Sequence, residues 1–337
     1  MQSSETIRLG VVQPRDHWGE EAPQMLQDAL AYVEDAGRRG VNLLLFPEMY
    51  PGPISYDVRY DAIGPLQEVC ARHRVTVAAG TTTPVAGRPH GYHVTHVLID
   101  SSGTIRGQYH RTHPKSQVYA GLYGAGGCAE FEYVAADDFP VFDLGWAVIG
   151  ISICSEMFVP EVARILALKG AEICLFPVGW TIDDLGWRDI WQTLVRARAI
   201  ENIMFTAACQ NLFDRTMLRH YTGRDIPAGD SEGLNRGLAI IAGPESVLGV
   251  MPNAGLLTAD LDLARLRLMR RSQEFPDGLT LPPPFGSVPG VHILRRPELT
   301  APLLAAEAKT LPAIAPFKFS PAAAAPPPSQ KRAAAGG

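Results

Sequence analysis

The chain has 337 residues, of which 46% are hydrophobic and 19% charged, enough to bury a substantial core in one large α/β domain. A net charge of −5 and a pI near 6.0 lack the basic excess of a nucleic-acid-binding protein. No apolar run approaches the roughly 18 residues of a membrane-spanning helix, and the first residues do not follow the pattern of a signal peptide. We therefore expect a soluble, cytoplasmic protein with neither a membrane nor a nucleic-acid partner.

The five cysteines are scattered along the chain and form no CxxC pair. This spacing favours a reducing compartment and argues against disulfides and a structural zinc site. The five are Cys70, Cys128, Cys154, Cys174 and Cys209.

The hydrophobic pattern predicts strands and helices that alternate along the chain, with hairpins inserted. Two buried strands flank an amphipathic helix at the N-terminus, which predicts a β-α-β unit with parallel strands. The expected elements, in chain order, are a strand at 7–14, a helix at 20–40, a strand at 41–48, a helix at 64–74, a strand at 75–83, a hairpin at 93–111, a strand at 146–154, a helix at 159–170, a strand at 171–180, a helix at 191–202, a strand at 203–211, and two strands with a helix start at 237–266. We predict one α/β domain over residues 1–271. A Pro-rich arm at 272–317 and a disordered tail at 318–337 follow it.

Three of the predicted strands end in groups that can do chemistry. Glu48 follows the buried run "LLLFP", at the carboxyl edge where open α/β sheets bind ligands. Cys154 closes "AVIGISIC" directly before a helix, where backbone N–H groups and a nearby cation lower a thiol pKa. The N–H of Ser155 would point into an oxyanion hole there. The third strand end reads "QYHRTHPK", residues 108–115.

Three segments in this order resemble the nitrilase, or carbon–nitrogen hydrolase, superfamily. They are "LLLFPEMY", "GISICSEMFVPEVARILALKGAEICLFP" and "RARAIEN", and the resemblance covers residues 6 to 271. It implies an αββα sandwich that dimerises face to face into a longer layered assembly. It also implies a catalytic Glu, Lys and Cys, often with a second Glu, and no cofactor or metal. On this resemblance Glu48 is the general base, and Cys154 is the nucleophile that forms a covalent thioester.

The catalytic lysine is the point where the chain departs from this family. The lysine of the usual Tyr-Arg-Lys-x-His pattern is replaced by Arg111. A guanidinium can stabilise an oxyanion, but it transfers a proton poorly because its pKa exceeds about 12. Lys115 could supply an amine instead if the strand continued, since residues 111, 113 and 115 would share one face. Pro114 argues against that continuation, and both residues stay open, with Lys115 narrowly preferred.

Two further positions bear on activity. The resemblance places the supporting carboxylate near Glu130, with Glu132 as the neighbouring choice. "CSE" differs from the Tyr-Asp that many relatives carry after the cysteine and is closer to the Trp-Glu of nitrilases proper. This departure leaves the choice between amide and nitrile substrates open.

The remaining features give weaker predictions. Histidines at a spacing of three, such as His93 and His96, lie on opposite faces of a strand, so we predict no metal site. The glycine-rich "YAGLYGAGG" is interpreted as a loop over the active site that His113 helps to orient. Trp180, just after a strand end, is a candidate for the wall of the substrate site, although a core aromatic is an equal alternative.

The sequence therefore predicts a cysteine-dependent amidohydrolase that acts on a linear, non-peptide C–N bond of a small molecule. A nitrilase or N-carbamoyl hydrolase would use the same cysteine, and an acyltransferase would pass the acyl group to an amine in place of water. A degenerate binding or scaffold protein, with Arg111 as the lesion, is the alternative outside enzymes. We expect a homodimer or a higher homo-oligomer.

Overall fold

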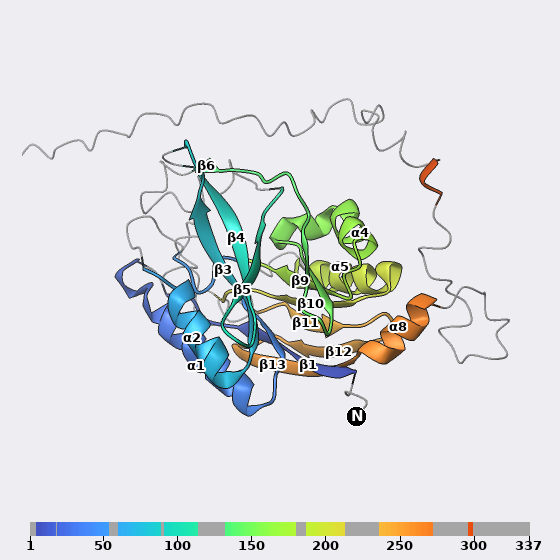
Figure 1. Cartoon of the computed structure of the whole chain (residues 1–337), viewed down its shortest axis with the longest axis horizontal. Helices are drawn as coiled ribbons and strands as arrows, with labels where there is room; N and C mark the ends of the chain where they lie inside the picture. Colours follow the sequence, from blue (N-terminus) through green and yellow to red (C-terminus); the bar gives the residue numbers. More distant parts are fainter. Residues whose placement is uncertain are drawn as a thin grey trace, which may run out of the picture.

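The computed structural model describes residues 5–17, 19–53, 60–88, 91–113, 132–179, 187–212, 236–271 and 296–298. Within these residues two β-sheets pack against each other, and pairs of helices lie on the outer sides (Figure 1). The predicted α/β class is confirmed. The Pro-rich arm, apart from residues 296–298, and the tail lie outside the described residues.

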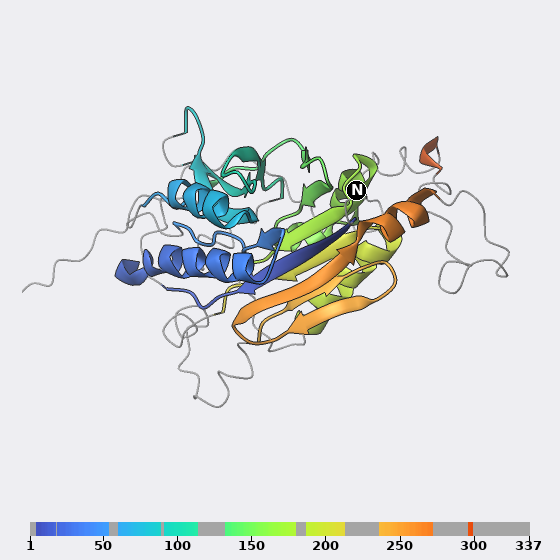
Figure 2. The ribbon, with the colours of Figure 1, turned by 60° about the horizontal axis from the view of Figure 1, so that its bottom comes forward.

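The first sheet has seven strands, and its core is parallel. β1, β2 and β3 pair in parallel, because helices α1 and α2 return the chain to the same end after each strand. Its strands, in spatial order, are β13 (Gly255–Asp262), β1 (Thr6–Gln13), β2 (Leu43–Leu45), β3 (Thr76–Pro84), β4 (Gly91–Ile99) and β5 (Ile105–His110), with β6 (Glu132–Tyr133) paired to β4. Figure 2 shows β13 beside β1, so residues from the two ends of the domain complete this sheet.

The second sheet has six strands, and β8, β9 and β10 at its centre pair in parallel, as expected from the strand–helix alternation in this half of the chain. Its strands, in spatial order, are β12 (Val247–Met251), β11 (Ala239–Ala242), β10 (Phe205–Cys209), β9 (Ile173–Pro177), β8 (Val148–Ile151) and β7 (Val141–Asp143). The short strands β6 and β7 were not expected from the sequence, because two or three residues carry no readable alternation.

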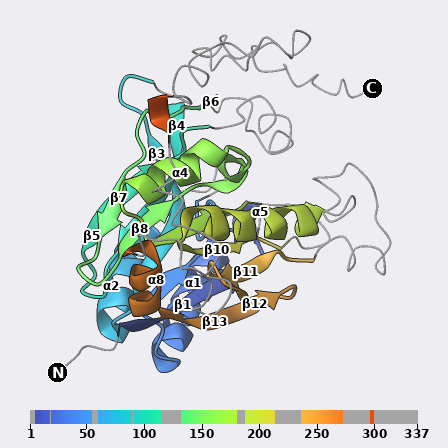
Figure 3. The same cartoon turned by 90° about the vertical axis from the view of Figure 1, so that its right-hand side faces the viewer.

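The helices follow the apolar stripes in the sequence. α1 (Gln24–Arg38) buries Met25, Ala29 and Val33 at helical spacing, and α2 (Ile63–His73) lies beside it. α4 (Pro160–Leu168) and α5 (Trp187–Asn202) lie together on the other side of the molecule (Figure 3). α8 (Leu263–Arg271) follows β13, and short 3₁₀ turns occur at η1 (Gly19–Glu21) and η4 (Cys154–Phe158).

The carboxyl ends of the parallel strands in both sheets lie at one edge of the sandwich. The segments that follow β1 and β10 bridge in parallel, with Asp16 N donating to Leu212 O at 3.0 Å and Leu212 N donating to Pro14 O at 2.9 Å. β5 runs parallel to β3, because both are antiparallel to β4. Residues that follow β2, β5 and β8 are therefore brought to the same edge.

Within the described residues, no helix is both long and apolar enough to cross a membrane.

Candidate active site

Glu48 occupies a tight turn after β2 and is almost completely buried. Glu48 N donates to Val178 O at 3.3 Å, and the Asn211 side-chain amide donates to Glu48 O at 3.0 Å, so the ends of β9 and β10 fix the turn. Two positions that contact this turn, residues 80 and 179, are glycines with little space for a side chain. A Cβ on Gly80 would meet Met49 N at 2.3 Å, and a Cβ on Gly179 would meet Glu48 Oε2 at 2.7 Å. The carboxylate therefore has a fixed place between the two sheets.

Cys154 lies three residues after the end of β8, at the start of η4, and only 6% of its surface is exposed. Its φ of 55° is left-handed, a conformation that a non-glycine residue adopts only when its surroundings hold it there. The Cys154 side chain hydrogen-bonds to the carboxylate of Glu48. The thiol and the carboxylate thus meet at the edge where the two sheets join.

Arg111 comes directly after β5 and is completely buried. Its Nη1 donates to Glu48 Oε1 at 2.7 Å, and its Nη2 donates to Ser155 Oγ at 2.5 Å. The guanidinium therefore lies between the carboxylate and the residue that follows the thiol. β5 ends at His110, and residues 111–113 are not part of a strand.

The environment of Glu48 sets its protonation. Burial is the largest influence and raises the pKa of its carboxyl, while Arg111 and the hydrogen bond with Cys154 act to lower it. A carboxylate with a raised pKa that contacts a thiol can accept the thiol proton and return it at a later step.

Burial makes the other described cysteines poor nucleophiles. It raises the pKa of Cys70 to about 12, and it raises the pKa values of Cys174 and Cys209 still further above the usual thiol range. Cys128 lies outside the described residues. Among the described thiols, Cys154 has the contact with a carboxylate that base-assisted attack requires.

Glu156 is a site residue that the sequence analysis missed. It is completely buried, and its carboxylate binds the chain on both sides of Arg111 and the N–H of Ile153. The sequence alone connects "CSE" only with the choice of substrate. The available signal was a carboxylate two residues after a strand-end cysteine.

The remaining predicted site residues have different outcomes. Lys115, Glu130 and Trp180 lie outside the described residues, as does the glycine-rich loop. His113 is partly exposed, and its N–H donates to Glu156 Oε1 at 3.1 Å. His113 therefore contacts the carboxylate of Glu156, two residues after Cys154.

The histidines of β4 and β5 lie on both faces of the first sheet. His93 and His110 share one face, with ring centroids 4.6 Å apart, whereas His96 is buried on the other and faces the carbonyl oxygen of Phe46 at 3.1 Å. Among the described residues no three His, Cys, Asp or Glu side chains form a group that could hold a metal ion.

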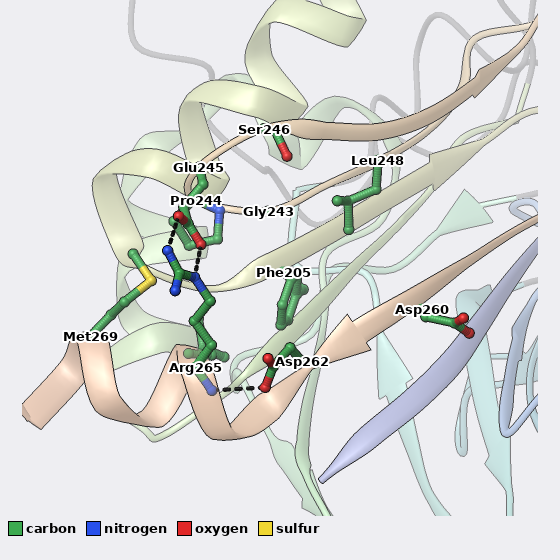
Figure 4. Close-up of a pocket in the computed structure, with 11 residues that line it drawn as sticks. Phe205, Gly243, Pro244, Glu245, Ser246, Leu248, Asp260, Asp262, Arg265 and Met269 are labelled. Carbon is green, nitrogen blue, oxygen red and sulfur yellow. Dashed lines mark hydrogen bonds and ion pairs between the residues drawn. The ribbon is translucent and has the colours of Figure 1, made fainter. Parts of the chain in front are cut away.

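A separate pocket of about 200 Å³ lies between the β11–β12 turn and α8 (Figure 4). Phe205, Leu266 and Met269 are among its lining residues, and it shares no residue with the Glu48, Arg111 and Cys154 cluster. Its charged groups already have partners: Glu245 binds Arg265 at 2.5 and 2.6 Å, and Asp262 caps the first turn of α8. We assign no ligand to this pocket.

Residues 8–271 match the carbon-nitrogen hydrolase family. The chain belongs to this family. It is a carbon–nitrogen hydrolase with amidase relatives, as the motifs predicted. It is 26% identical over 293 residues to the N-carbamoylputrescine amidase of Solanum tuberosum, covering 81% of this chain and 87% of that protein. It is 29% identical over 208 residues to the 2-oxoglutaramate amidase of Paenarthrobacter nicotinovorans, covering 56% of this chain and 66% of that protein.

Solved structures of carbon–nitrogen hydrolases share the fold. The carbon-nitrogen hydrolase of Helicobacter pylori G27 superposes with a TM-score of 0.67 at 20% identity, covering 90% of this chain and 99% of that one. Nit3 of Saccharomyces cerevisiae, a member of the nitrilase superfamily, gives a TM-score of 0.63 at 17% identity, covering 82% of this chain and 96% of that one. The two-sheet α/β architecture is therefore the architecture of the nitrilase superfamily.

Proposed function

We propose that this carbon–nitrogen hydrolase is an amidase that cleaves the C–N bond of a small, linear amide through a thioester on Cys154. The observation that carries the proposal is the meeting of a thiol, a carboxylate and a guanidinium at one buried point, where Glu48 contacts both Cys154 and Arg111. These are the groups that nucleophilic catalysis of acyl transfer requires: a nucleophile, its base and a cation.

In the first half of the reaction, Glu48 takes the thiol proton and the sulfur attacks the carbonyl carbon. Arg111 and the N–H of Ser155 stabilise the oxyanion that forms. Guanidinium cannot give up a proton at neutral pH, so the leaving nitrogen receives its proton from Glu48. The raised pKa of the Glu48 carboxyl supports this role, since the proton it gained from the thiol is held strongly enough to be carried to the nitrogen.

In the second half, water replaces the departed ammonia or amine. Glu48 accepts a proton from the water while the water oxygen attacks the thioester carbon. The C–S bond then breaks, the carboxylic acid leaves, and the proton on Glu48 returns to the sulfur. The products are a carboxylic acid and ammonia or an amine, and each group of the enzyme ends in its starting state.

Relatives and structural neighbours support amides ahead of nitriles as the substrate class. Four of the related proteins are amidases by name, three of them N-carbamoylputrescine amidases and the fourth a 2-oxoglutaramate amidase. One from Schizosaccharomyces pombe, 24% identical over 227 residues, is a probable nitrilase. A mutant of the amidase from Nesterenkonia sp. AN1, with a TM-score of 0.59 at 22% identity, carries the acetamide moiety of fluoroacetamide on its active-site cysteine. Nitrile or N-carbamoyl hydrolysis, and acyl transfer to an amine, would use the same thioester.

The test is ammonia release from matched panels of small amides, nitriles and N-carbamoyl compounds. We expect turnover of amides by the parent protein, none by Cys154→Ala, and unchanged turnover by Cys70→Ala, which removes a buried thiol outside the site. Turnover by a folded Cys154→Ala protein would exclude the mechanism. Product analysis with added hydroxylamine distinguishes transfer to an amine from hydrolysis.

We also propose that the protein is a homodimer that assembles through the face formed by α4 and α5. This face exposes large apolar side chains, whereas the large apolar side chains of α1 and α2 are buried or partly buried. The exposed residues are Phe158, Leu168, Ile190 and Ile200. An exposed apolar patch of this kind is typical of an interaction surface.

A further inference from the structure

Glu156 lies two residues after the nucleophile and accepts hydrogen bonds from five groups, although it is completely buried. Its Oε1 accepts from Thr112 N at 2.6 Å, Thr112 Oγ1 at 2.6 Å and His113 N at 3.1 Å. Its Oε2 accepts from Tyr109 Oη at 2.8 Å and Ile153 N at 2.6 Å. One carboxylate on the second segment therefore binds residues of the first that precede it by 43 to 47 positions in the sequence.

The first segment carries the cation. Tyr109 and Thr112 flank Arg111, and both bind Glu156. The backbone of Arg111 is also fixed, since its N–H donates to Val94 O at 2.9 Å and its carbonyl accepts from Ala136 N at 3.1 Å. The place from which the guanidinium reaches Glu48 and Ser155 is thus set by the strand end that Glu156 holds.

The second segment carries the nucleophile. Ile153 N donates to the Glu156 side chain at 2.6 Å, while Glu156 N donates to Ile153 O at 3.2 Å, which closes a small ring around Cys154. A left-handed non-glycine residue such as Cys154 costs about 1–3 kcal/mol and persists only where the surrounding contacts determine it. The ring formed by Glu156 is such a contact.

The carboxylate acts here in its ionised form. Its Oε1 accepts from three donors and its Oε2 from two, so the lone pairs of both oxygens are already engaged by donors, which favours the ionised form. Burial is the largest influence on the pKa of Glu156 and tends to raise it. The contacts with His113, Arg111, Thr112 and Tyr109 outweigh burial, so the pKa lies below its usual value.

We propose that Glu156 is a positioning residue, which holds the cation of Arg111 and the thiol of Cys154 in the relative placement that acyl transfer needs. This inference rests on the proposed function and adds a residue that acts through others, without contact with the substrate. The physical reason is that reacting groups must be held within a fraction of an ångström, and a displacement of about 1 Å costs on the order of 10²-fold in rate.

The main variant is Glu156→Gln, which keeps the size of the side chain. Either orientation of the new amide turns an NH₂ group toward a backbone N–H, from Thr112 in one case and from Ile153 in the other. We expect kcat to fall by about 10² or more, with KM changed by less than about threefold. Glu156→Asp keeps the charge but shortens the reach, and it should recover part of the lost kcat.

A milder variant and a matched control separate positioning from stability. Tyr109→Phe removes one hydroxyl donor and should lower kcat about three- to tenfold with an intact fold. Glu172→Gln removes another buried carboxylate, which lies outside the site and accepts a hydrogen bond of 2.7 Å from Arg267. This control variant should therefore lower Tm without lowering kcat. The rate of Cys154 alkylation by iodoacetamide gives a readout that needs no substrate. This rate should fall in Glu156→Gln and Glu156→Asp and should stay unchanged in Glu172→Gln.

The outcomes are distinct. Full kcat and a full alkylation rate in folded Glu156→Gln and Tyr109→Phe would overturn the positioning role. So would a loss of kcat in Glu172→Gln equal to that in Glu156→Gln, if the two variants have the same Tm. If Glu156→Gln does not fold, Tyr109→Phe and Glu156→Asp decide the question by the same criteria. Activity in Cys154→Ala, by contrast, would remove the proposed function itself.

Discussion

The guanidinium of Arg111 lies 2.7 Å from the carboxylate of Glu48, and both side chains are almost completely buried. Arg111 stands at the position of the lysine that the resemblance predicted, and it contacts the residue that we propose as the general base. A buried pair holds its partners firmly, because loss of one leaves an uncompensated charge in a medium of low dielectric constant. The pair therefore favours Arg111 over Lys115 as the cation of the site.

The first prediction concerns that cation. Arg111→Ala should lower kcat by about 10² or more, since it removes an oxyanion donor, whereas Lys115→Ala should have a weaker effect. Arg111→Lys keeps the charge and should retain more activity than Arg111→Ala. Steady-state kinetics on folded protein checks the order. A large loss in Lys115→Ala with full activity in Arg111→Ala would reverse the assignment.

The second prediction uses a glycine to probe the base. A Cβ at residue 179 would lie 2.7 Å from Glu48 Oε2, so Gly179→Ala should displace the carboxylate and lower kcat about tenfold or more. Gly249→Ala is the matched control, because its Cβ would meet the movable side chain of Leu257 at 3.0 Å, away from the site. Equal kcat values for the two variants would argue against Glu48 as the base.

The third prediction concerns the thiols. In a Cys128→Ser background, iodoacetamide should label Cys154 much faster than Cys70, Cys174 or Cys209, because burial raises the pKa values of those three thiols. Peptide mass spectrometry after timed quenching gives the four rates. Labelling of a second cysteine at a comparable rate would contradict the environment described for it.

The fourth prediction concerns stability at mildly acidic pH. Burial lowers the pKa of His96 from 6.5 to about 4, so the unfolded chain binds this proton first as the pH falls. The contribution of neutral His96 is therefore complete above pH 6.5 and is lost progressively between pH 6.5 and about 4, on the order of 3 kcal/mol in all. Denaturant unfolding of the parent and of His96→Gln across this range should show a steeper decline in the parent. Parallel curves would show that His96 does not carry this dependence.

The fifth prediction concerns assembly. Light scattering at micromolar concentration should give the mass of a dimer for the parent protein, and Ile200→Glu should shift it toward a monomer by placing a charge on the α4–α5 face. Leu268→Glu changes a residue on α8 that is 63% exposed and should leave the mass unchanged. A monomeric parent would contradict the proposed dimer, and a dimer that only Leu268→Glu disrupts would place the interface elsewhere.

The order of strands and helices could be predicted from the sequence because it depends on local patterns. Apolar alternation and helical spacing located β1, α1 and the β4–β5 hairpin, since these elements are long and each has a consistent periodicity. β2 has only three residues, and the continuous apolar run around it located it. Glu48 and Cys154 could be picked out because a reactive side chain directly after a buried strand is visible in the chain itself.

Only the tertiary structure decided how the site is put together. The contacts of Arg111 with Glu48 and Ser155 join residues 63 and 44 positions apart, and no local pattern encodes such pairs. The end of β5 at His110 removed the geometric argument for Lys115, which depended on a longer strand. Glu156 is the clearest case: its charge is evident in the sequence, but its role follows from five donors that the fold brings to one buried carboxylate.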